Sequence, residues 1–490
     1  MADCCSTDGS RKGGYDLAVI GAGSAGFSAA ITAAEQGANV ALIGHGLIGG
    51  TCVNVGCVPS KTMIRAAEAL HGAGAASRFA GLAGEAHLTD WRALIGAKDD
   101  LVGTLRQKKY VDLLPEYNGI AYLEGAARLN GAGVLVNDSP VAAGKIIVAT
   151  GASPAIANIP GIENIPYLTS TTALELDQQP RSLLVIGGGY IGCELAQMFA
   201  RTGTAVTMVT RSRLLPEAEP EIAQALARYL ADEGITVRTG LTYSRIEQQD
   251  GEITLTIDVD GRAETLTAEQ VLVTTGRMPN TADLGLEEAG IRLAPNGGIV
   301  VDDRMRTSKS GVYAAGDVIG RDQFVYMAAY GAKLAARNAL NGDSLVYDNT
   351  AMPWVVFTDP QVAGVGLTEK AAKAAGFETK TSIVSLDQVP RALAARDTRI
   401  EEAKMVPSHG LGLAGLLAAK IVCCAVIILA ATGAISFAGL AGWLVGGGLF
   451  WLAATVLAII GFVFWHRSAR PNGSDVRKDA VMRPLHRLQK

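Results

Sequence analysis

The amino-acid sequence predicts an α/β protein with two Rossmann-like dinucleotide-binding domains, a truncated α+β interface domain and a C-terminal two-helix transmembrane hairpin. The two nucleotide domains are predicted by a glycine pattern that occurs twice, each time between an apolar strand and a helix. The hairpin is predicted by residues 421–465, which contain no charged side chain. This stretch is too long for one span of about 20 residues and long enough for two.

Composition and charge narrow the functional classes. The chain has 490 residues, enough for several domains, and its formal net charge of −4 gives no reason to expect nucleic-acid binding. Seven cysteines are too few for the disulfide scaffold of a secreted protein of this length. The leader, residues 1–14, is polar and lacks the pattern of a signal peptide. We therefore expect the catalytic part to lie in the cytoplasm.

The first glycine pattern lies in "YDLAVIGAGSAGFSAAITAAEQGANVALIG" and consists of Gly21, Gly23 and Gly26. The first glycine makes a tight turn, the second lets the backbone approach a pyrophosphate, and the third lets helix and strand pack closely. The helix N-terminus would bind the pyrophosphate. The second strand ends in Gly44 and not in the acidic residue that usually binds the ribose. We expect His45 or a water molecule to take that role.

The second glycine pattern consists of Gly187, Gly189 and Gly192, again between a strand and a helix. Here the second strand is followed by Arg211 and Arg213, with no acid for a free ribose 2′-hydroxyl. Two guanidinium groups would bind a 2′-phosphate, which predicts NADPH rather than NADH. The alternative is that both arginines are solvated surface residues.

Three further segments are predicted to run from a strand into a nucleotide site. "KIIVATGASP" and "QVLVTTGRMPN" each read as a strand followed by a glycine turn, at Gly151 and at Gly276–Arg277. "GVYAAGDV" would bring Gly316 and Asp317 to a nucleotide. Asp317 is expected either to bind a ribityl hydroxyl or to cap a helix. Two nucleotide sites in one chain suggest two cofactors that exchange electrons.

A pair of cysteines, Cys52 and Cys57, lies in "GGTCVNVGCVPSK". A structural zinc site needs four ligands, and no second Cys/His cluster accompanies the pair. A permanent disulfide is disfavoured in the cytoplasm. The predicted helix N-terminus at this motif, together with Lys61, would favour a thiolate. These features favour a reversible redox pair.

From Tyr15 to Arg399 the chain resembles the pyridine nucleotide–disulfide oxidoreductases in both glycine patterns, in the cysteine motif, and in "GRMPN" and "AAGD". The resemblance implies that electrons pass from NADPH to FAD and then to the cysteines. It implies that Cys57 lies against the flavin as the thiolate and that Cys52 is the more exposed exchange thiol. It also implies further site residues: Gly50 and Thr51 at the cofactor, Lys61 at the flavin edge, and Tyr190 and Glu194 beside the nicotinamide, with Tyr190 as a movable gate.

Two segments, "AMPWVVFTDPQVAGVGLTEKAAKAAG" and "LDQVPRALAARDTR", resemble the mercuric reductase branch of this family. This resemblance implies a homodimer that reduces a Hg(II)–thiol complex to Hg(0). Soft Hg²⁺ prefers two thiolates, so Cys52 and Cys57 would also be its ligands. Two alternatives stay open: a reductase of a low-molecular-weight disulfide, and a mercury-binding or transport protein with an impaired reductase half.

The resemblance is expected to end at Arg399, before the family's longer interface domain is complete. The predicted spans lie near residues 413–435 and 440–464, and a basic tail follows them. Positive charge on the tail and an even number of spans predict a cytoplasmic enzyme tethered to the inner membrane. The predicted boundaries are a leader (1–14), an FAD-binding domain in two parts (15–152 and 281–348), an NADPH-binding domain (153–280), a truncated interface domain (349–399), a linker (400–412), the hairpin (413–465) and a cytoplasmic tail (466–490).

Each of the two vicinal cysteine pairs outside the motif has two interpretations. Cys423 and Cys424 fall in the first predicted span, and bacterial mercury-transport proteins have a vicinal cysteine pair in the same place. The pair would pass Hg²⁺ to the reductase, or it would serve as small apolar side chains. Cys4 and Cys5 in the leader would bind Hg²⁺ or be incidental. Cys193 is expected to pack in the core.

Overall fold

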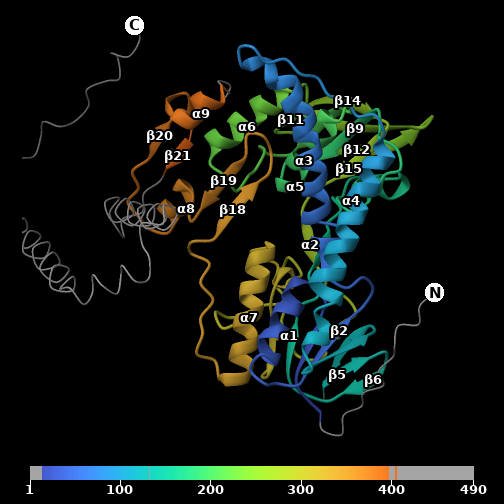
Figure 1. Cartoon of the computed structure of the whole chain (residues 1–490), viewed down its shortest axis with the longest axis vertical. Helices are drawn as coiled ribbons and strands as arrows, with labels where there is room; N and C mark the ends of the chain where they lie inside the picture. Colours follow the sequence, from blue (N-terminus) through green and yellow to red (C-terminus); the bar gives the residue numbers. More distant parts are fainter. Residues whose placement is uncertain (1–13, 132, 397–402, 406–490) are drawn as a thin grey trace, which may run out of the picture. The chain divides into compact units, whose positions relative to one another are not determined.

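The computed structural model describes residues 14–131, 133–396 and 403–405 (Figure 1). The predicted hairpin at 413–465 and tail at 466–490 lie outside the described residues, as does most of the linker. The same holds for the four cysteines in vicinal pairs: Cys4, Cys5, Cys423 and Cys424. Among the residues that are described, no helix is both long and apolar enough to cross a membrane.

The first nucleotide-binding sheet is parallel and has five strands in the order β17-β7-β1-β2-β3. Its strands are apolar because both faces are covered, and helices α1 and α7 pack against each other beside it (Figure 1). β17 follows the second nucleotide-binding sheet in the chain, so this domain is built from two separate segments. The bounds are β1 Tyr15–Ile20, β2 Val40–Gly44, β3 Ile120–Glu124, β7 Ala143–Val148, β17 Val312–Ala314, α1 Ser24–Ala34 and α7 Val325–Asn341.

The second nucleotide-binding sheet is also parallel, with four strands in the order β11-β10-β9-β15. A separate antiparallel sheet, β12-β13-β14, packs its apolar side chains against it in one cluster. The bounds are β9 Ser182–Ile186, β10 Ala205–Thr210, β11 Thr236–Thr239, β12 Thr242–Gln249, β13 Glu252–Val259, β14 Arg262–Ala268, β15 Gln270–Val273, α5 Tyr190–Arg201 and α6 Pro220–Asp232.

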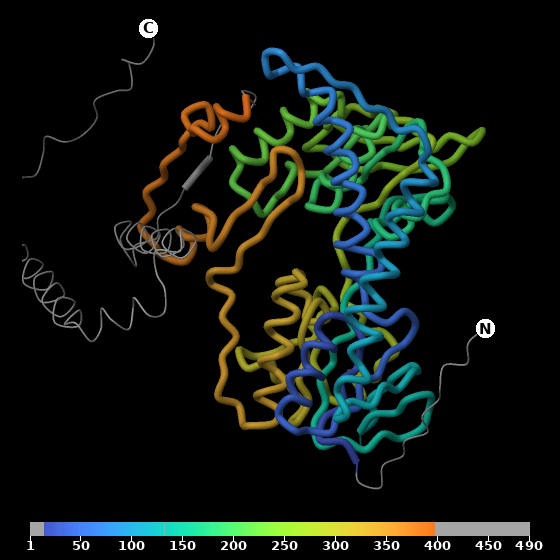
Figure 2. The backbone as a smooth tube through the Cα atoms, in the orientation of Figure 1, coloured from blue at the N-terminus to red at the C-terminus, as the bar shows by residue number. Residues whose placement is uncertain are grey.

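Two long helices and a short ribbon connect the two nucleotide domains. Helices α3 and α4 run between the domains in Figure 2, and α3 packs on α5 of the second one. The antiparallel pair β8 and β16 lies where the chain enters and leaves the second domain. The bounds are α2 Gly50–Asn54, α3 Cys57–Gly74, α4 Trp91–Arg106, β8 Ala152–Pro154 and β16 Arg277–Pro279, with a small peripheral sheet of β4 Ala127–Asn130, β5 Gly133–Val136 and β6 Ser139–Val141.

The described part of the interface domain contains two antiparallel strand pairs and two short helices. Several of its large apolar side chains are exposed, among them Val365, Phe377, Ile383 and Leu393. Its elements are β18 Pro353–Val356, β19 Val362–Val365, α8 Glu369–Ala374, β20 Ser382–Val384, α9 Pro390–Ala395 and β21 Ala403–Met405.

Candidate active site

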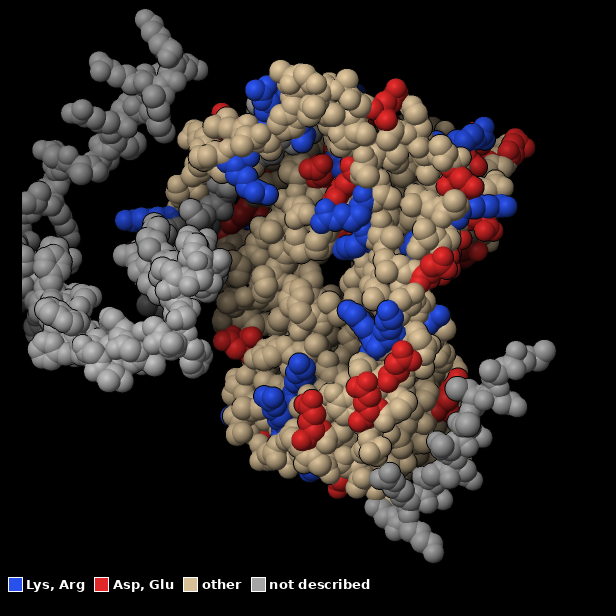
Figure 3. Space-filling view, in the orientation of Figure 1, with Lys and Arg blue, Asp and Glu red and all other residues tan. Residues whose placement is uncertain are grey.

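A cavity of about 1820 Å³ joins the two nucleotide domains, and the surface is hollowed there (Figure 3). It lies at the carboxyl ends of the parallel strands, where open α/β sheets bind their ligands. The cavity brings together most of the site residues that the sequence predicts. These are Gly21, Gly23, Gly50, Thr51, Cys52, Cys57, Lys61, Gly151, Gly187, Gly189, Tyr190, Glu194, Arg211, Gly276, Arg277 and Asp317.

The outer glycines of both patterns are required by the protein's own backbone. Gly21 and Gly187 both have φ of 118°, and a Cβ would lie 2.3 Å and 2.4 Å from a carbonyl oxygen of a neighbouring strand end. Gly26 and Gly192 do not line the cavity, because they pack beneath it. A Cβ on either would lie 1.7 Å or 2.3 Å from the carbonyl oxygen of the first glycine of its own pattern.

The middle glycines face the cavity. A Cβ on Gly189 would meet nothing within 4 Å, and one on Gly23 would meet only Gly50 Cα, at an ordinary 3.4 Å. Helices α1 and α5 begin at the next residue, and neither has a side chain that caps its first N–H groups. Open space beside uncapped helix N-termini fits the pyrophosphates of two dinucleotides, here FAD and NADPH.

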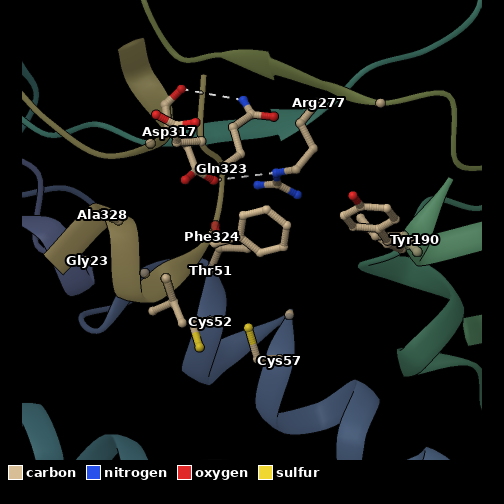
Figure 4. A pocket seen from close by; sticks show the side chains of 18 of the residues that line it. Gly23, Thr51, Cys52, Cys57, Tyr190, Arg277, Asp317, Gln323, Phe324 and Ala328 are labelled. Atoms are coloured by element: carbon tan, nitrogen blue, oxygen red, sulfur yellow. Dashed lines mark hydrogen bonds and ion pairs between the residues drawn. The ribbon is translucent and has the colours of Figure 1, made fainter. Parts of the chain in front are cut away.

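The two cysteines of the motif lie on neighbouring helices, and their sulfur atoms are side by side (Figure 4). Cys57 is the first residue of α3, and Cys52 lies in α2. The pKa of Cys57 is lowered to about 7, because a hydrogen bond from Cys52 and the charge of Lys61 outweigh the opposing effects of burial and Glu194. The same hydrogen bond and burial raise the pKa of Cys52. Cys57 is therefore the thiolate of the pair, and Cys52 stays protonated.

Cys57 opens into the cavity, on the side where the family resemblance places the flavin. Cys57 is exposed and Cys52 is half-buried. The reason is that Cys57 stands at the first turn of α3, where the helix end opens into the cavity. The expectation that Cys52 is the more exposed thiol once FAD lies against Cys57 stays a prediction.

Lys61 and Glu194 join the cysteine helix to the second nucleotide domain. Lys61 Nζ lies 2.6 Å from Glu194 Oε2, and Glu194 is only 6% exposed. The other carboxylate oxygen of Glu194 accepts a hydrogen bond of 2.9 Å from the backbone N–H of Phe357, whose ring lies 4.8 Å from Lys61 Nζ. A residue after β18 therefore helps to hold the ion pair, and no sequence motif had pointed to Phe357.

Tyr190 is the first residue of α5 and stands in a row of aromatic rings. Its ring stacks on Trp354, with centroids 5.6 Å apart, and lies 5.8 Å from Phe324. Burial raises the pKa of Tyr190 to about 12, so its phenol is neutral. The sequence analysis missed Trp354 and Phe324, because aromatic residues outside a motif carry no signal of their position.

Arg277 and Asp317 meet where the first sheet opens into the cavity (Figure 4). Arg277 Nε lies 3.8 Å from the Asp317 carboxylate. Burial raises the pKa of Asp317, against the opposing effect of the guanidinium. Gly316 does not line the cavity; it has φ of 79°, and a Cβ there would lie 2.9 Å from Ala25 Cβ. The glycine thus lets the chain pass close to α1, and the carboxylate beyond it can bind a ligand hydroxyl.

Arg211 and Arg213, the two predicted 2′-phosphate ligands, differ in their position relative to the cavity and in their hydrogen bonds. Arg213 does not line the cavity, and its guanidinium donates hydrogen bonds of 2.7 Å and 2.8 Å to the carbonyl oxygens of Pro216 and Ala218. Arg211 lines the cavity and makes no hydrogen bond or ion pair to any other described residue. Arg211 is therefore the better placed of the two, and phosphate binding by either arginine stays a prediction.

Two family profiles match the chain. The pyridine nucleotide-disulphide oxidoreductase profile covers residues 15–336, and that of the family's dimerisation domain covers residues 352–428. The second match continues past Arg399 and ends inside the first predicted membrane span.

Curated relatives and solved structures agree with these matches. A mercuric reductase from Staphylococcus aureus is 46% identical over 80% of this chain and 72% of its own length. One from Streptomyces lividans is 46% identical over 83% of this chain and 86% of its own. The HOCl-induced flavoprotein disulfide reductase RclA from Escherichia coli, solved as a Cu(II) complex, has a TM-score of 0.70 at 30% identity, over 81% of this chain and 87% of its own.

The shared sequence extends across both nucleotide domains and the cysteine motif. The site geometry fits two dinucleotides, and the family's members use FAD and a pyridine nucleotide. The chain therefore belongs to the pyridine nucleotide-disulphide oxidoreductase family and is an oxidoreductase that uses FAD and NADPH.

Proposed function

We propose that this enzyme reduces Hg(II), bound as a thiol complex, to Hg(0) with two electrons from NADPH, which leaves as NADP⁺ with release of a proton. The observation that carries the proposal is the Cys52–Cys57 pair, with one thiolate and one thiol, in the cavity shared by both nucleotide sites. Mercuric reductases that are 44–46% identical to this chain support the choice of substrate. Two neighbouring sulfurs also match the preference of Hg²⁺ for soft ligands.

The side chains have distinct roles in this proposal. The Cys57 thiolate displaces one thiolate from the mercury complex, and Cys52 gives its proton to the second departing thiolate as it binds. The proton released by NADPH oxidation then restores the Cys52 thiol. Lys61 balances the charge of the Cys57 sulfur, and Glu194 holds Lys61 in place. Bound FAD supplies the two-electron chemistry that the side chains lack.

Tyr190 and Asp317 position the nucleotides in the same proposal. The Tyr190 ring, stacked on Trp354, covers the nicotinamide pocket and moves when NADPH enters. Asp317, held near Arg277, binds a ribityl hydroxyl of FAD. Arg211 binds the 2′-phosphate of NADPH, because its guanidinium lines the cavity and Arg213 is engaged elsewhere.

Rates of NADPH oxidation by the purified chain test the substrate. We expect the fastest oxidation with Hg²⁺ in excess thiol and slower oxidation with glutathione disulfide or lipoamide. Cys57→Ser should abolish the mercury-dependent rate. Cys193→Ala is the matched control, because Cys193 is a buried thiol outside the cavity. Equal or faster oxidation with either disulfide would favour the alternative, a reductase of low-molecular-weight disulfides.

We also propose a homodimer, supported by the dimerisation-domain match and by the exposed apolar side chains of the interface domain. Light scattering on the purified chain should give twice the mass of one chain. A mass of one chain at micromolar concentration would contradict this part of the proposal.

Residues 413–465 are proposed to tether the enzyme to the inner membrane, because residues 421–465 carry no charge. Cys423–Cys424 and Cys4–Cys5 would then pass Hg²⁺ to Cys52 and Cys57. The full chain should stay in the membrane pellet after an alkaline carbonate wash. Its complete release into the supernatant would show that the hairpin prediction is wrong.

A further inference from the structure

The end of β2 lacks the side chain that a dinucleotide-binding domain normally has there. An acidic residue at this point usually binds a ribose hydroxyl, and this chain has Gly44. Gly44 pairs with Glu124 at the end of β3, so the two strand ends lie side by side. Side chains of β3 therefore lie beside residue 44, where the acidic side chain would be.

The phenol of Tyr122 fills that position. A Cβ built on Gly44 would lie 2.5 Å from Tyr122 Oη and 2.8 Å from Ala22 Cβ. Both distances are too short for a side chain at residue 44 unless both Tyr122 and Ala22 shift. Tyr122 and Ala22 also line the cavity, close to the middle glycine of the first pattern. The hydroxyl thus stands where the acidic side chain would begin, although it comes from the neighbouring strand.

We propose that the Tyr122 hydroxyl binds the adenosine ribose of FAD in place of a side chain at residue 44. A phenol both donates and accepts hydrogen bonds, so it can pair with a ribose hydroxyl as a carboxylate does. Burial, with the nearby charge of Glu124, raises the pKa of Tyr122, which keeps the phenol protonated. Glu124 does not line the cavity, whereas His45 does line it, as an exposed residue just after the strand. The inference is independent of the substrate at the cysteines.

FAD binding by the apoprotein of the full chain tests this role. The ligands are FAD and its analogue with 2′-deoxyadenosine, and the signal is flavin fluorescence. Tyr122→Phe should bind FAD about tenfold more weakly, the effect of one lost hydrogen bond, and should bind the analogue as the parent chain does. Tyr313→Phe is the matched control, because that hydroxyl bonds to Asp343 away from the cavity. Unchanged FAD affinity, or equal weakening of both ligands, would overturn the proposal.

A second pair of variants tests whether the Tyr122 hydroxyl stands in for a carboxylate at residue 44. Gly44→Glu alone should weaken FAD binding, because its side chain collides with Tyr122. Adding Tyr122→Ala should recover part of the lost affinity, because it removes the collision with the phenol and leaves only the contact with Ala22 Cβ. Parent-like affinity of Gly44→Glu alone, or no recovery in the double variant, contradicts the proposal. So does a preference for the 2′-hydroxyl that disappears in His45→Ala and persists in Tyr122→Phe.

Discussion

The two glycine patterns have the same backbone geometry and different surroundings. In both, the first glycine has φ of 118°, the third packs against the carbonyl of the first, and the middle one faces the cavity. The strands that follow end differently. β2 ends in Gly44 beside the phenol of Tyr122, whereas β10 ends at Thr210 and is followed by Arg211 in the cavity.

This comparison distinguishes the glycines that build a nucleotide site from the side chains that select the nucleotide. Backbone contacts between strand and helix determine the glycines, and these contacts are the same for any dinucleotide. Selectivity depends on one or two side chains at the strand ends. The side chain that we propose comes from a neighbouring strand in the first domain and from the loop after the strand itself in the second.

The largest expected effect tests the shared backbone geometry. Gly26→Ala and Gly192→Ala should each destabilise their domain by about 3 kcal/mol, because a Cβ would overlap a carbonyl oxygen. Gly189→Ala should leave stability within about 0.5 kcal/mol, because its Cβ enters open space, and should weaken NADPH binding. Thermal unfolding and nucleotide titration measure both. If Gly189→Ala unfolded as readily as Gly192→Ala, the glycines would not have separate roles.

The next largest effect is expected from substitutions of the two arginines of the second domain, which test the preference for NADPH. Arg211→Ala should raise the KM for NADPH roughly 10- to 100-fold, the effect of a lost charge-assisted hydrogen bond, and should change the KM for NADH little. Arg213→Ala should lower stability and leave the ratio of the two KM values unchanged, because Arg213 bonds to two backbone carbonyls. Steady-state kinetics with both nucleotides decide between the residues. Loss of the preference for NADPH in Arg213→Ala alone would reverse the assignment.

A smaller effect concerns the ion pair that joins the two domains. The pKa of Cys57 is lowered to about 7, so its thiolate forms as the pH rises through 7 and not through the higher pKa of an ordinary thiol. Alkylation of the reduced enzyme by iodoacetamide should therefore increase with a midpoint near pH 7. Lys61→Met should move the midpoint upward, since a positive charge is lost, and Glu194→Gln should move it downward. Shifts in the same direction for both variants would contradict the charge balance described here.

The smallest expected effect concerns the aromatic row at the second site. An aromatic pair contributes about 0.5–1.5 kcal/mol beyond its buried area, so Trp354→Ala should release the Tyr190 ring and speed NADPH entry by roughly 2- to 10-fold. Stopped-flow reduction by NADPH measures this rate. Trp354→Phe is the control that keeps a stacked ring. An unchanged or slower entry in Trp354→Ala would mean that the stack does not restrain Tyr190.

Local patterns were sufficient to predict both nucleotide domains and the cysteine pair. Gly21, Gly187 and the cysteine motif act through turns and helix ends, which involve residues close together in the sequence. Lys61 could be predicted for the same reason, since it lies in the first turns of the cysteine helix. The side chains that Lys61 and Tyr190 contact could not be predicted. Phe357 and Trp354 come from a domain that begins more than a hundred residues later.

The amino-acid sequence alone determined the family and the two cofactors and predicted the cysteine pair, because each depends on glycines and cysteines at fixed short spacings. Only the tertiary structure decided that Arg213 bonds to its own loop, that Phe357 holds Glu194 beside Lys61, and that Tyr122 fills the space beside Gly44. The physical reason is that exposure and side-chain contacts depend on which strands and helices become neighbours. Strand pairing across the sheet, such as that of β2 with β3, brings together residues that no spacing along the chain relates.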